Sequence, residues 1–387
     1  LAVAHKSYLS KECDFKVEDE KDMVLIGYLA FLDPPKQSAA SAIKQLHEHG
    51  IEVKILSGDN DAVVQTIARQ VGIETRNALT GPQFEAMEEE EQRQAVCKTN
   101  VFSKLTPIQK TQIIMLLQEQ QNTVGFLGDG INDAAALRQS DIGISVDSAV
   151  DIAKESADII LLEKDLMVLE DGVLEGRKTF GNITKYIKMT ASSNFGNMFS
   201  VMAASAFLPF LPMLPIHLLI QNLLYDISQT TIPFDRMDAD YLRKPRKWDA
   251  SDISRFMIFI GPISFIFDIV TYLVMWYVFS CNSVEHQTLF QSGWFIEGLL
   301  SQTLIVHMIR TQKIPFIQSC ASWQVTGLTV LIMVIGIIIP FSPFGTSIGL
   351  EPLPLSYFPW LVGILLSYCV LTQMIKNWYI KRFVKWL

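Results

Sequence analysis

Residues 123–137 read TVGFLGDGINDAAAL. The stretch joins a short apolar run to a Gly-Asp-Gly turn, and a second aspartate, Asp133, follows Asp129 by four residues. The apolar run is typical of a buried strand, and the flanking glycines, Gly128 and Gly130, let the backbone turn tightly and approach a ligand closely. This stretch therefore predicts a strand whose carboxyl end presents two carboxylates.

The first half of the chain alternates short apolar runs with segments whose apolar residues recur at helical spacing. This alternation predicts an α/β domain with a parallel sheet, built from strand–helix–strand units. We expect strands at 23–33, 51–59, 123–129, 141–146 and 157–163, and helices at 36–50, 61–72, 106–120 and 148–157. Active sites of such sheets lie beyond the carboxyl ends of the strands. The polar residues at that edge are Ser57, Asp59, Asp129 and Asp133.

The composition limits the classes of function. The chain of 387 residues has a net charge of −8, whereas a nucleic-acid-binding surface needs a basic excess, so no nucleic-acid partner is expected. The five cysteines are scattered without CxxC spacing, which indicates neither a disulfide framework nor a zinc site. The chain starts on Leu without a signal peptide, and its first residues read like the middle of a domain, which indicates a fragment.

Long apolar blocks follow the soluble half, and each is long enough to cross about 30 Å of hydrocarbon. We expect an all-α membrane bundle of about six transmembrane helices, at 190–211, 213–233, 256–280, 288–309, 321–341 and 356–375. Lysine and arginine concentrate in the connections 235–255 and 310–315 and in the tail, and the alternate connections contain none. The positive-inside rule then places the N-terminal domain and the C-terminal tail on the cytoplasmic side of the membrane.

Polar side chains inside the predicted spans need a reason, because a charge in hydrocarbon is costly. Two helical faces gather such residues: Asn194 and Asn197 on one, and Asn222, Asp226 and Gln229 on the next. Their oxygens suit a hard divalent cation such as Mg²⁺ or Ca²⁺, and hydrogen bonding between helices is the alternative for the asparagines. Asp268 and Glu297 are weaker candidates, which fit contacts inside the bundle as well as an aqueous edge.

Four motifs, in this order, resemble those of the P-type ATPases, whose phosphorylation domain belongs to the haloacid dehalogenase superfamily. They are FLDPPK at 31–36, SGDN at 57–60, FSKLTPIQK at 102–110 and GDGINDAAAL at 128–137. The helical stretch at 165–189 resembles the stalk that continues into the fifth membrane helix of that family. SSNFGNMFS at 192–200 and LIQNLLYDISQTTIPFD at 219–235 are most similar to the bacterial magnesium-transporting branch, which imports Mg²⁺.

The resemblance implies an order of domains along the chain. Residues 1–22 would end a nucleotide-binding domain, and 23–165 would form a haloacid-dehalogenase-like, Rossmann-like phosphorylation domain. Residues 166–189 would be the stalk helix, and 190–387 the membrane domain, with the spans matching membrane helices five to ten.

The resemblance also implies roles for single residues in phosphoryl transfer from ATP. Asp129 and Asp133 would hold the catalytic Mg²⁺, with Asn132 beside the phosphoryl group. Lys110 would offset the negative charge of the transferred group, and Ser57 would donate a hydrogen bond to its oxygen. Physical chemistry agrees, because catalysis of this reaction is mostly positioning and electrostatics, and two carboxylates in a glycine turn suit the small octahedral shell of Mg²⁺.

Further positions follow from the same resemblance. Asp59 would support the nucleotide side of the site, although it could instead cap the helix that follows it. Asp33 would help to hold the loops. Glycines that bring the backbone close to the cofactor would be Gly58, Gly128 and Gly130. The ion-transport positions would be Asn194, Asn197, Asn222 and Asp226.

The DKTGT segment, which carries the phosphorylated aspartate in this family, is absent from the sequence. The nucleotide-binding domain, the actuator domain and the first four membrane helices are absent as well. We therefore interpret the chain as the C-terminal half of an ATP-driven Mg²⁺ importer, which needs the missing N-terminal part and is inactive alone because it lacks the nucleophile. The alternatives are a Ca²⁺-transporting P-type ATPase fragment and a truncated, non-catalytic membrane partner protein.

Overall fold

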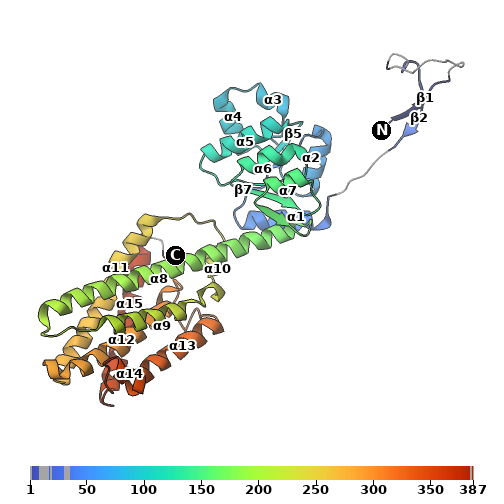
Figure 1. Ribbon diagram of the computed structural model, residues 1–387. Coiled ribbons are helices and arrows are strands. Elements are labelled where there is room, and N and C mark those ends of the chain that lie inside the picture. Colours follow the sequence, from blue (N-terminus) through green and yellow to red (C-terminus); the bar gives the residue numbers. More distant parts are fainter. Residues whose placement is uncertain (1, 8–16, 18–19, 30–34, 384–385, 387) are drawn as a thin grey trace. The chain divides into compact units, whose positions relative to one another are not determined.

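The computed structural model describes residues 2–7, 17, 20–29, 35–383 and 386. The chain divides into two compact units, residues 1–170 and 171–387 (Figure 1). All described strands lie in the first unit, and the second unit is built from helices. The predicted succession of an α/β domain and an all-α domain is therefore confirmed.

Two parallel sheets form the centre of the first unit. One has the strand order β3 (Ile55–Leu56), β5 (Val101–Ser103), β4 (Leu79–Thr80). The other has the order β6 (Gly125–Leu127), β7 (Ile142–Val146), β8 (Ile159–Leu161). Every pairing within them is parallel, with Leu56 opposite Phe102 and Phe126 opposite Gly143. The predicted parallel arrangement is confirmed.

Short helices cover the sheets and connect their strands. They are α1 (Gln37–Glu48), α2 (Asp61–Gln70), α3 (Gly81–Glu85), α4 (Glu89–Lys98), α5 (Pro107–Glu119), α6 (Ala134–Gln139) and α7 (Asp151–Ser156). Thr106 caps α5 and Pro107 opens it, at the start of the helix predicted at 106–120. Asn60 caps α2, because its side chain accepts a hydrogen bond from the Ala62 N–H at 3.0 Å. The sequence analysis allowed Asp59 as the cap of this helix, and the structure shows that the next residue, Asn60, is the cap.

The strand expected at 23–33 does not join the parallel sheets. Instead, β2 (Val24–Tyr28) pairs antiparallel with β1 (Ala2–His5) in a separate sheet of two strands, and residues 30–34 lie outside the described part. The sequence analysis also missed β4, α3, α4 and β5 between residues 79 and 103. With two residues in β4 and three in β5, these strands are too short for a periodic pattern to show.

The two parallel sheets share apolar contacts, and each keeps a free edge. Leu56 of β3 packs both against the cluster that contains Phe102 and against the cluster that contains Phe126. Among the described strands, the outer strands of both sheets, β3 and β4 in one and β6 and β8 in the other, pair with one neighbour only. An edge strand offers unpaired backbone N–H and C=O groups to a further strand. Both sheets therefore have an edge that can accept a further strand.

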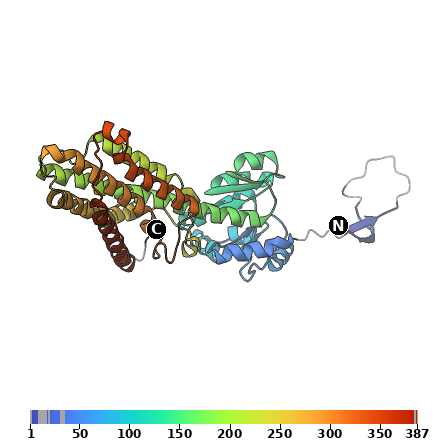
Figure 2. The ribbon, with the colours of Figure 1, turned by 90° about the horizontal axis from the view of Figure 1, so that it is seen from below.

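The second unit is a helical bundle around α12 (Gln287–Ile309), which is buried over most of its length. The helices that pack on α12 are α9 (Pro215–Gln229), α11 (Ala250–Leu273), α13 (Trp323–Ile338) and α15 (Tyr357–Phe383). The unit also contains α8 (Leu166–Phe207) from residue 171 onward and the short helices α10 (Ala239–Leu242) and α14 (Pro343–Ser347). Its long helices run alongside one another (Figure 2).

Three of the described helices are long and apolar enough to cross a membrane: Ala250–Val278, Trp323–Phe341 and Tyr357–Phe383. They correspond to the third, fifth and sixth predicted spans. The other three predicted spans fall on α8, α9 and α12, which are helical but either too short or too polar to qualify on their own. With 15 residues, α9 is shorter than the roughly 20 residues that a simple span needs. The number of six spans stays a prediction.

Asp235, which follows α9, gathers two cations at one end of this bundle. Its Oδ2 accepts hydrogen bonds from Lys185 Nζ at 2.7 Å and from Arg310 Nε at 2.8 Å. Its Oδ1 accepts a bond from the Ser322 N–H at 3.2 Å. The three charged side chains are at most 2% exposed. Burial alone would raise the pKa of the Asp235 carboxyl, but Lys185 and Arg310 together hold that pKa below its ordinary value.

Replacing this carboxylate should destabilise the bundle. We expect Asp235→Asn to cost about 3–5 kcal/mol, because two buried cations lose their counter-charge. The control is Asp240→Asn, whose ion pair with Arg243 is exposed and contributes about 0–1 kcal/mol. Thermal unfolding of the detergent-solubilised chain measures both, and equal midpoints for the two variants would contradict this assignment.

The contribution of the Asp235 ion pairs to the free energy of unfolding falls at low pH. Because the folded pKa of Asp235 lies below its unfolded value of about 3.9, the contribution is fully present above that value. It is lost as the pH falls through the folded pKa.

Candidate active site

The turn after β3 directs Ser57 and Asp59 toward each other. Ser57 Oγ donates a hydrogen bond to Asp59 Oδ2 at 2.8 Å and accepts one from the Asp59 N–H at 3.1 Å. The turn is fixed from the other side by the segment after β5, where the Lys104 N–H donates to Asp59 O and the Leu105 N–H to Ser57 O. A Cβ on Gly58 would lie 3.3 Å from Leu105 O, so glycine suits this close approach. Ser57 and Asp59, both predicted site residues, lie together.

The turn after β6 brings Asp133 to Lys110. Lys110 Nζ, which α5 supplies, donates to Asp133 Oδ1 at 2.8 Å, and the two side chains are 11% and 15% exposed. Asp133 Oδ2 accepts a bond from the Gly130 N–H at 3.2 Å. A Cβ on Gly128 would lie 2.7 Å from the Asp133 Cβ, closer than real Cβ atoms approach. The turn therefore needs glycine at 128 to hold Asp133 in place.

The first aspartate of this turn has a different cation partner. Asp129 Oδ2 accepts a hydrogen bond from Lys164 Nζ at 2.7 Å, and both side chains are more than half exposed. Sequence reasoning missed Lys164. The available signal was its place just beyond β8, at the same edge of the sheet at which Asp129 follows β6.

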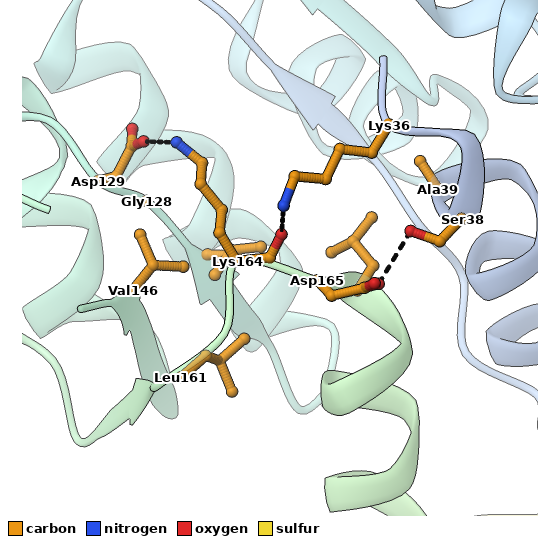
Figure 3. A pocket seen from close by; sticks show the side chains of 11 residues that line it. Lys36, Ser38, Ala39, Gly128, Asp129, Val146, Leu161, Lys164 and Asp165 are labelled. Atoms are coloured by element: carbon orange, nitrogen blue, oxygen red, sulfur yellow. Dashed lines mark hydrogen bonds and ion pairs between the residues drawn. The ribbon is translucent and has the colours of Figure 1, made fainter. Parts of the chain in front are cut away.

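A cavity of about 320 Å³ opens beside Asp129. Figure 3 shows Lys164 reaching across it to Asp129, with Lys36 and the Ser38–Asp165 pair on the far side. Lys36 donates to the Lys164 carbonyl, and Ser38 Oγ donates to Asp165 Oδ1 at 3.0 Å. The Met167 N–H and the Ser38 hydroxyl, both donating to Asp165, lower the pKa of that carboxyl. The charged groups of the lining are two carboxylates, Asp129 and Asp165, and two lysines, and the rest of the lining is mostly apolar.

The donor set at the end of β6 fits a magnesium ion. The described residues contain no group of three or more His, Cys, Asp or Glu side chains that could enclose a metal. Mg²⁺ does not need such a cage, because it is typically bound by one or two carboxylates together with waters and phosphate oxygens. Asp129 and Asp133 supply two carboxylates, and each is now held by a lysine that could turn to a phosphate.

The remaining predictions for this site have different outcomes. Asn132 lies in the short helical turn Ile131–Asp133 and is exposed, with no hydrogen bond among the described residues that would fix it. Asp33 lies outside the described residues. Both assignments stay predictions.

The polar residues predicted for ion transport lie in two environments. Asn194 and Asp226 are exposed, Asn222 is half-buried and Asn197 is buried. No hydrogen bond or ion pair among the described residues links these four side chains. The adjoining face of α9 packs in the bundle and buries Gln221, Tyr225, Ser228 and Gln229. Gln229, which the sequence grouped with Asp226, points into the bundle and accepts a bond from Thr190 Oγ1 at 3.0 Å.

Comparison with protein families agrees with this arrangement. Residues 4–141 match the family described as haloacid dehalogenase-like hydrolase. Residues 210–378 match the family described as cation transporting ATPase, C-terminus. The chain belongs to the P-type, cation-transporting ATPases.

Individual relatives point to one branch of that family. The protein named magnesium-transporting ATPase, P-type 1, of Salmonella typhimurium is 66% identical over 370 residues, which cover 96% of this chain and 41% of that protein. Its namesake in Escherichia coli K12 is 58% identical over 383 residues, or 99% of this chain and 43% of that protein. An endoplasmic reticulum calcium ATPase of Aspergillus fumigatus is 34% identical over 248 residues, 62% of this chain and 26% of that protein. The similarity is to the magnesium-transporting branch, and the chain spans less than half the length of these relatives.

The contact at Gly128 generates a stability prediction. We expect Gly128→Ala to cost about 1–3 kcal/mol, because the added methyl group displaces Asp133 from its bond to Lys110. The control is Gly172→Ala in α8, where a Cβ meets nothing within 4 Å and helix propensity should favour alanine by about 0.5–1 kcal/mol. Calorimetric unfolding of both variants is the measurement, and a Gly128→Ala protein as stable as the parent would refute the contact.

Proposed function

We propose that this chain is the C-terminal part of an ATP-driven pump that imports Mg²⁺ across the plasma (inner) membrane. The observation that carries the proposal is the site at the end of β6. There Asp129 and Asp133 stand as a pair of lysine-bound carboxylates in a glycine turn, in a chain whose second unit contains apolar helices of membrane-crossing length. The names of the similar magnesium-transporting proteins support the same cation.

In the proposed reaction, the chain's own residues position a phosphoryl group and offset its charge. Asp129 and Asp133 would bind Mg²⁺, which supplies electrostatic stabilisation of the transferring phosphoryl group. Lys110 would turn from Asp133 toward a phosphoryl oxygen, and Ser57 would donate its hydroxyl hydrogen to another. Asp59, which now accepts that hydroxyl hydrogen, would hold Ser57 in orientation. These contacts act where charge develops, which is how electrostatic catalysis works.

The aspartate that accepts the phosphoryl group would come from outside this chain. The free edges of β3 and β6 support this idea, because a parallel strand added there would end at the edge where Ser57 and Asp129 lie. A nucleophile at the end of such a strand would meet Lys110 and the two aspartates. Asn194 of α8 and Asp226 of α9 are each exposed, so a further helix could cover them and complete an ion site in the second unit.

The first prediction of this proposal concerns phosphorylation. We expect that the chain alone, incubated with γ-labelled ATP, acquires no acid-stable, hydroxylamine-sensitive label, because it lacks the nucleophile. Co-expression with the N-terminal part of a magnesium-transporting relative should restore such a label on that part. Asp129→Asn should abolish the restored label, and Asp151→Asn, at a carboxylate that is 94% exposed, should leave it unchanged. A label on the isolated chain would overturn the proposal.

The second prediction concerns the transported cation. In the complemented pump, we expect Asp226→Asn to lower Mg²⁺ uptake about tenfold, as the loss of about 1.4 kcal/mol of binding would do. Asp240→Asn, outside the predicted spans, serves as the matched control. Uptake is measured with Mg²⁺ and Ca²⁺ in parallel. Ca²⁺ uptake that depends on Asp226, without Mg²⁺ uptake, would instead assign the chain to a calcium pump.

A further inference from the structure

Lys164, the cation partner of Asp129, belongs to none of the four motifs on which the family resemblance rests. Those motifs end at residue 137, and Lys164 lies in the short connection between β8 and α8. Its Nζ donates a hydrogen bond to Asp129 Oδ2 at 2.7 Å. This oxygen belongs to one of the two carboxylates that we assign to Mg²⁺. A cation that holds the oxygen competes with a metal ion for the same negative charge.

Contacts with the start of α1 fix the backbone that carries Lys164. Lys36 donates a hydrogen bond to the Lys164 carbonyl, and Ser38 Oγ donates to Asp165 Oδ1 at 3.0 Å (Figure 3). The same Asp165 oxygen accepts a bond from the Met167 N–H at 2.9 Å, at the start of α8. The side chain of Lys164 therefore begins from a set position. Its reach to Asp129 is prepared by the fold, which lowers the entropy cost of the contact.

The Lys164 side chain can leave its partner more easily than the other lysine of the site can. The side chains of Lys164 and Asp129 are 58% and 53% exposed, whereas those of Lys110 and Asp133 are 11% and 15% exposed. An exposed ammonium that leaves its partner gains water and conformational freedom, but a buried one loses its counter-charge without full hydration. The cavity of about 320 Å³ beside Asp129 gives the moving side chain space.

We propose that Lys164 is a tethered counter-cation, which holds the Asp129 carboxylate until that carboxylate binds Mg²⁺. The proposal rests on the proposed function, because it takes Asp129 as a ligand of the catalytic Mg²⁺. The ammonium group would then turn to water or to a phosphate oxygen. Because the two cations compete, Lys164 raises the Mg²⁺ concentration at which the site fills. Before Mg²⁺ binds, Lys164 and Lys110 neutralise one carboxylate each, which limits the repulsion between Asp129 and Asp133.

Carbodiimide cross-linking of the detergent-solubilised full chain tests the contact and its exchange. The reagent joins a lysine amine to a carboxylate in contact with it, with loss of water, and mass spectrometry identifies the joined residues. We expect a link between Lys164 and Asp129, and millimolar Mg²⁺ should lower its yield several-fold compared with sodium chloride at equal ionic strength. The matched control is the exposed pair of Lys178 and Glu175 in α8, at 3.0 Å, whose link should respond equally to both salts.

The effect of Lys164 on metal affinity is measured with Mn²⁺, which replaces Mg²⁺ as a spectroscopic probe. The paramagnetic resonance signal of unbound Mn²⁺ gives the dissociation constant. We expect Lys164→Met to lower this constant about two- to fivefold, the range that an exposed ion pair allows. Lys164→Arg should keep the parent value, because its guanidinium still competes for Asp129. The control variant Lys178→Met should also keep it.

The outcomes separate this proposal from the function on which it rests. If Asp129→Asn weakens Mn²⁺ binding and Lys164→Met leaves it unchanged, Asp129 binds the metal without competition, and the inference about Lys164 is wrong. If Asp129→Asn leaves Mn²⁺ binding unchanged, the assignment of Asp129 in the proposed function fails as well. A cross-link that Mg²⁺ and sodium chloride affect equally would also overturn the inference. Should Lys164→Met not fold, the cross-link in the parent chain decides without a substitution.

Discussion

The helical unit depends on the neutralisation of Asp235. This carboxylate draws in Lys185 from α8, Arg310 from the end of α12 and the Ser322 N–H at the start of α13. Burying one charge is costly, and the cost is offset only when partners satisfy every oxygen. Lys188 pairs with Asp252 at 2.7 Å, and Lys376 donates to three backbone carbonyls that begin at Met308. The partners of these buried cations thus lie near helix ends: Asp235 follows α9, Asp252 lies in the first turn of α11 and Met308 near the end of α12.

The carboxyl groups in the middle of the bundle differ from Asp235 and Asp252, because no cation pairs with them among the described residues. Asp268 and Glu297 lie there without a cation, among hydroxyl, indole and amide groups. The structure thereby separates these buried acids of α11 and α12 from the buried cations of the unit, a separation that the sequence alone left undecided.

Several features of the first unit were predicted from particular residues. The apolar run before Asp129 predicted a strand, the helical spacing at 106–120 predicted a helix, and the alternation of strands and helices predicted parallel sheets. The prediction for 23–33 was wrong in topology, because an apolar run has no information about whether its partner strand is parallel or antiparallel. The strands at 79–80 and 101–103 were missed because they are shorter than any readable period.

The sequence by itself determined the class of protein and the chemistry available at the end of β6, because both rest on local spacing: a glycine turn with two aspartates, followed by long apolar segments. The tertiary structure decided the partners. It paired Asp129 with Lys164, gave the helix cap to Asn60, turned Gln229 inward and joined Asp268 to Trp294. Each of these contacts joins groups through backbone geometry or across separate elements. Spacing along the chain cannot specify them, because they depend on how helices and strands pack in three dimensions.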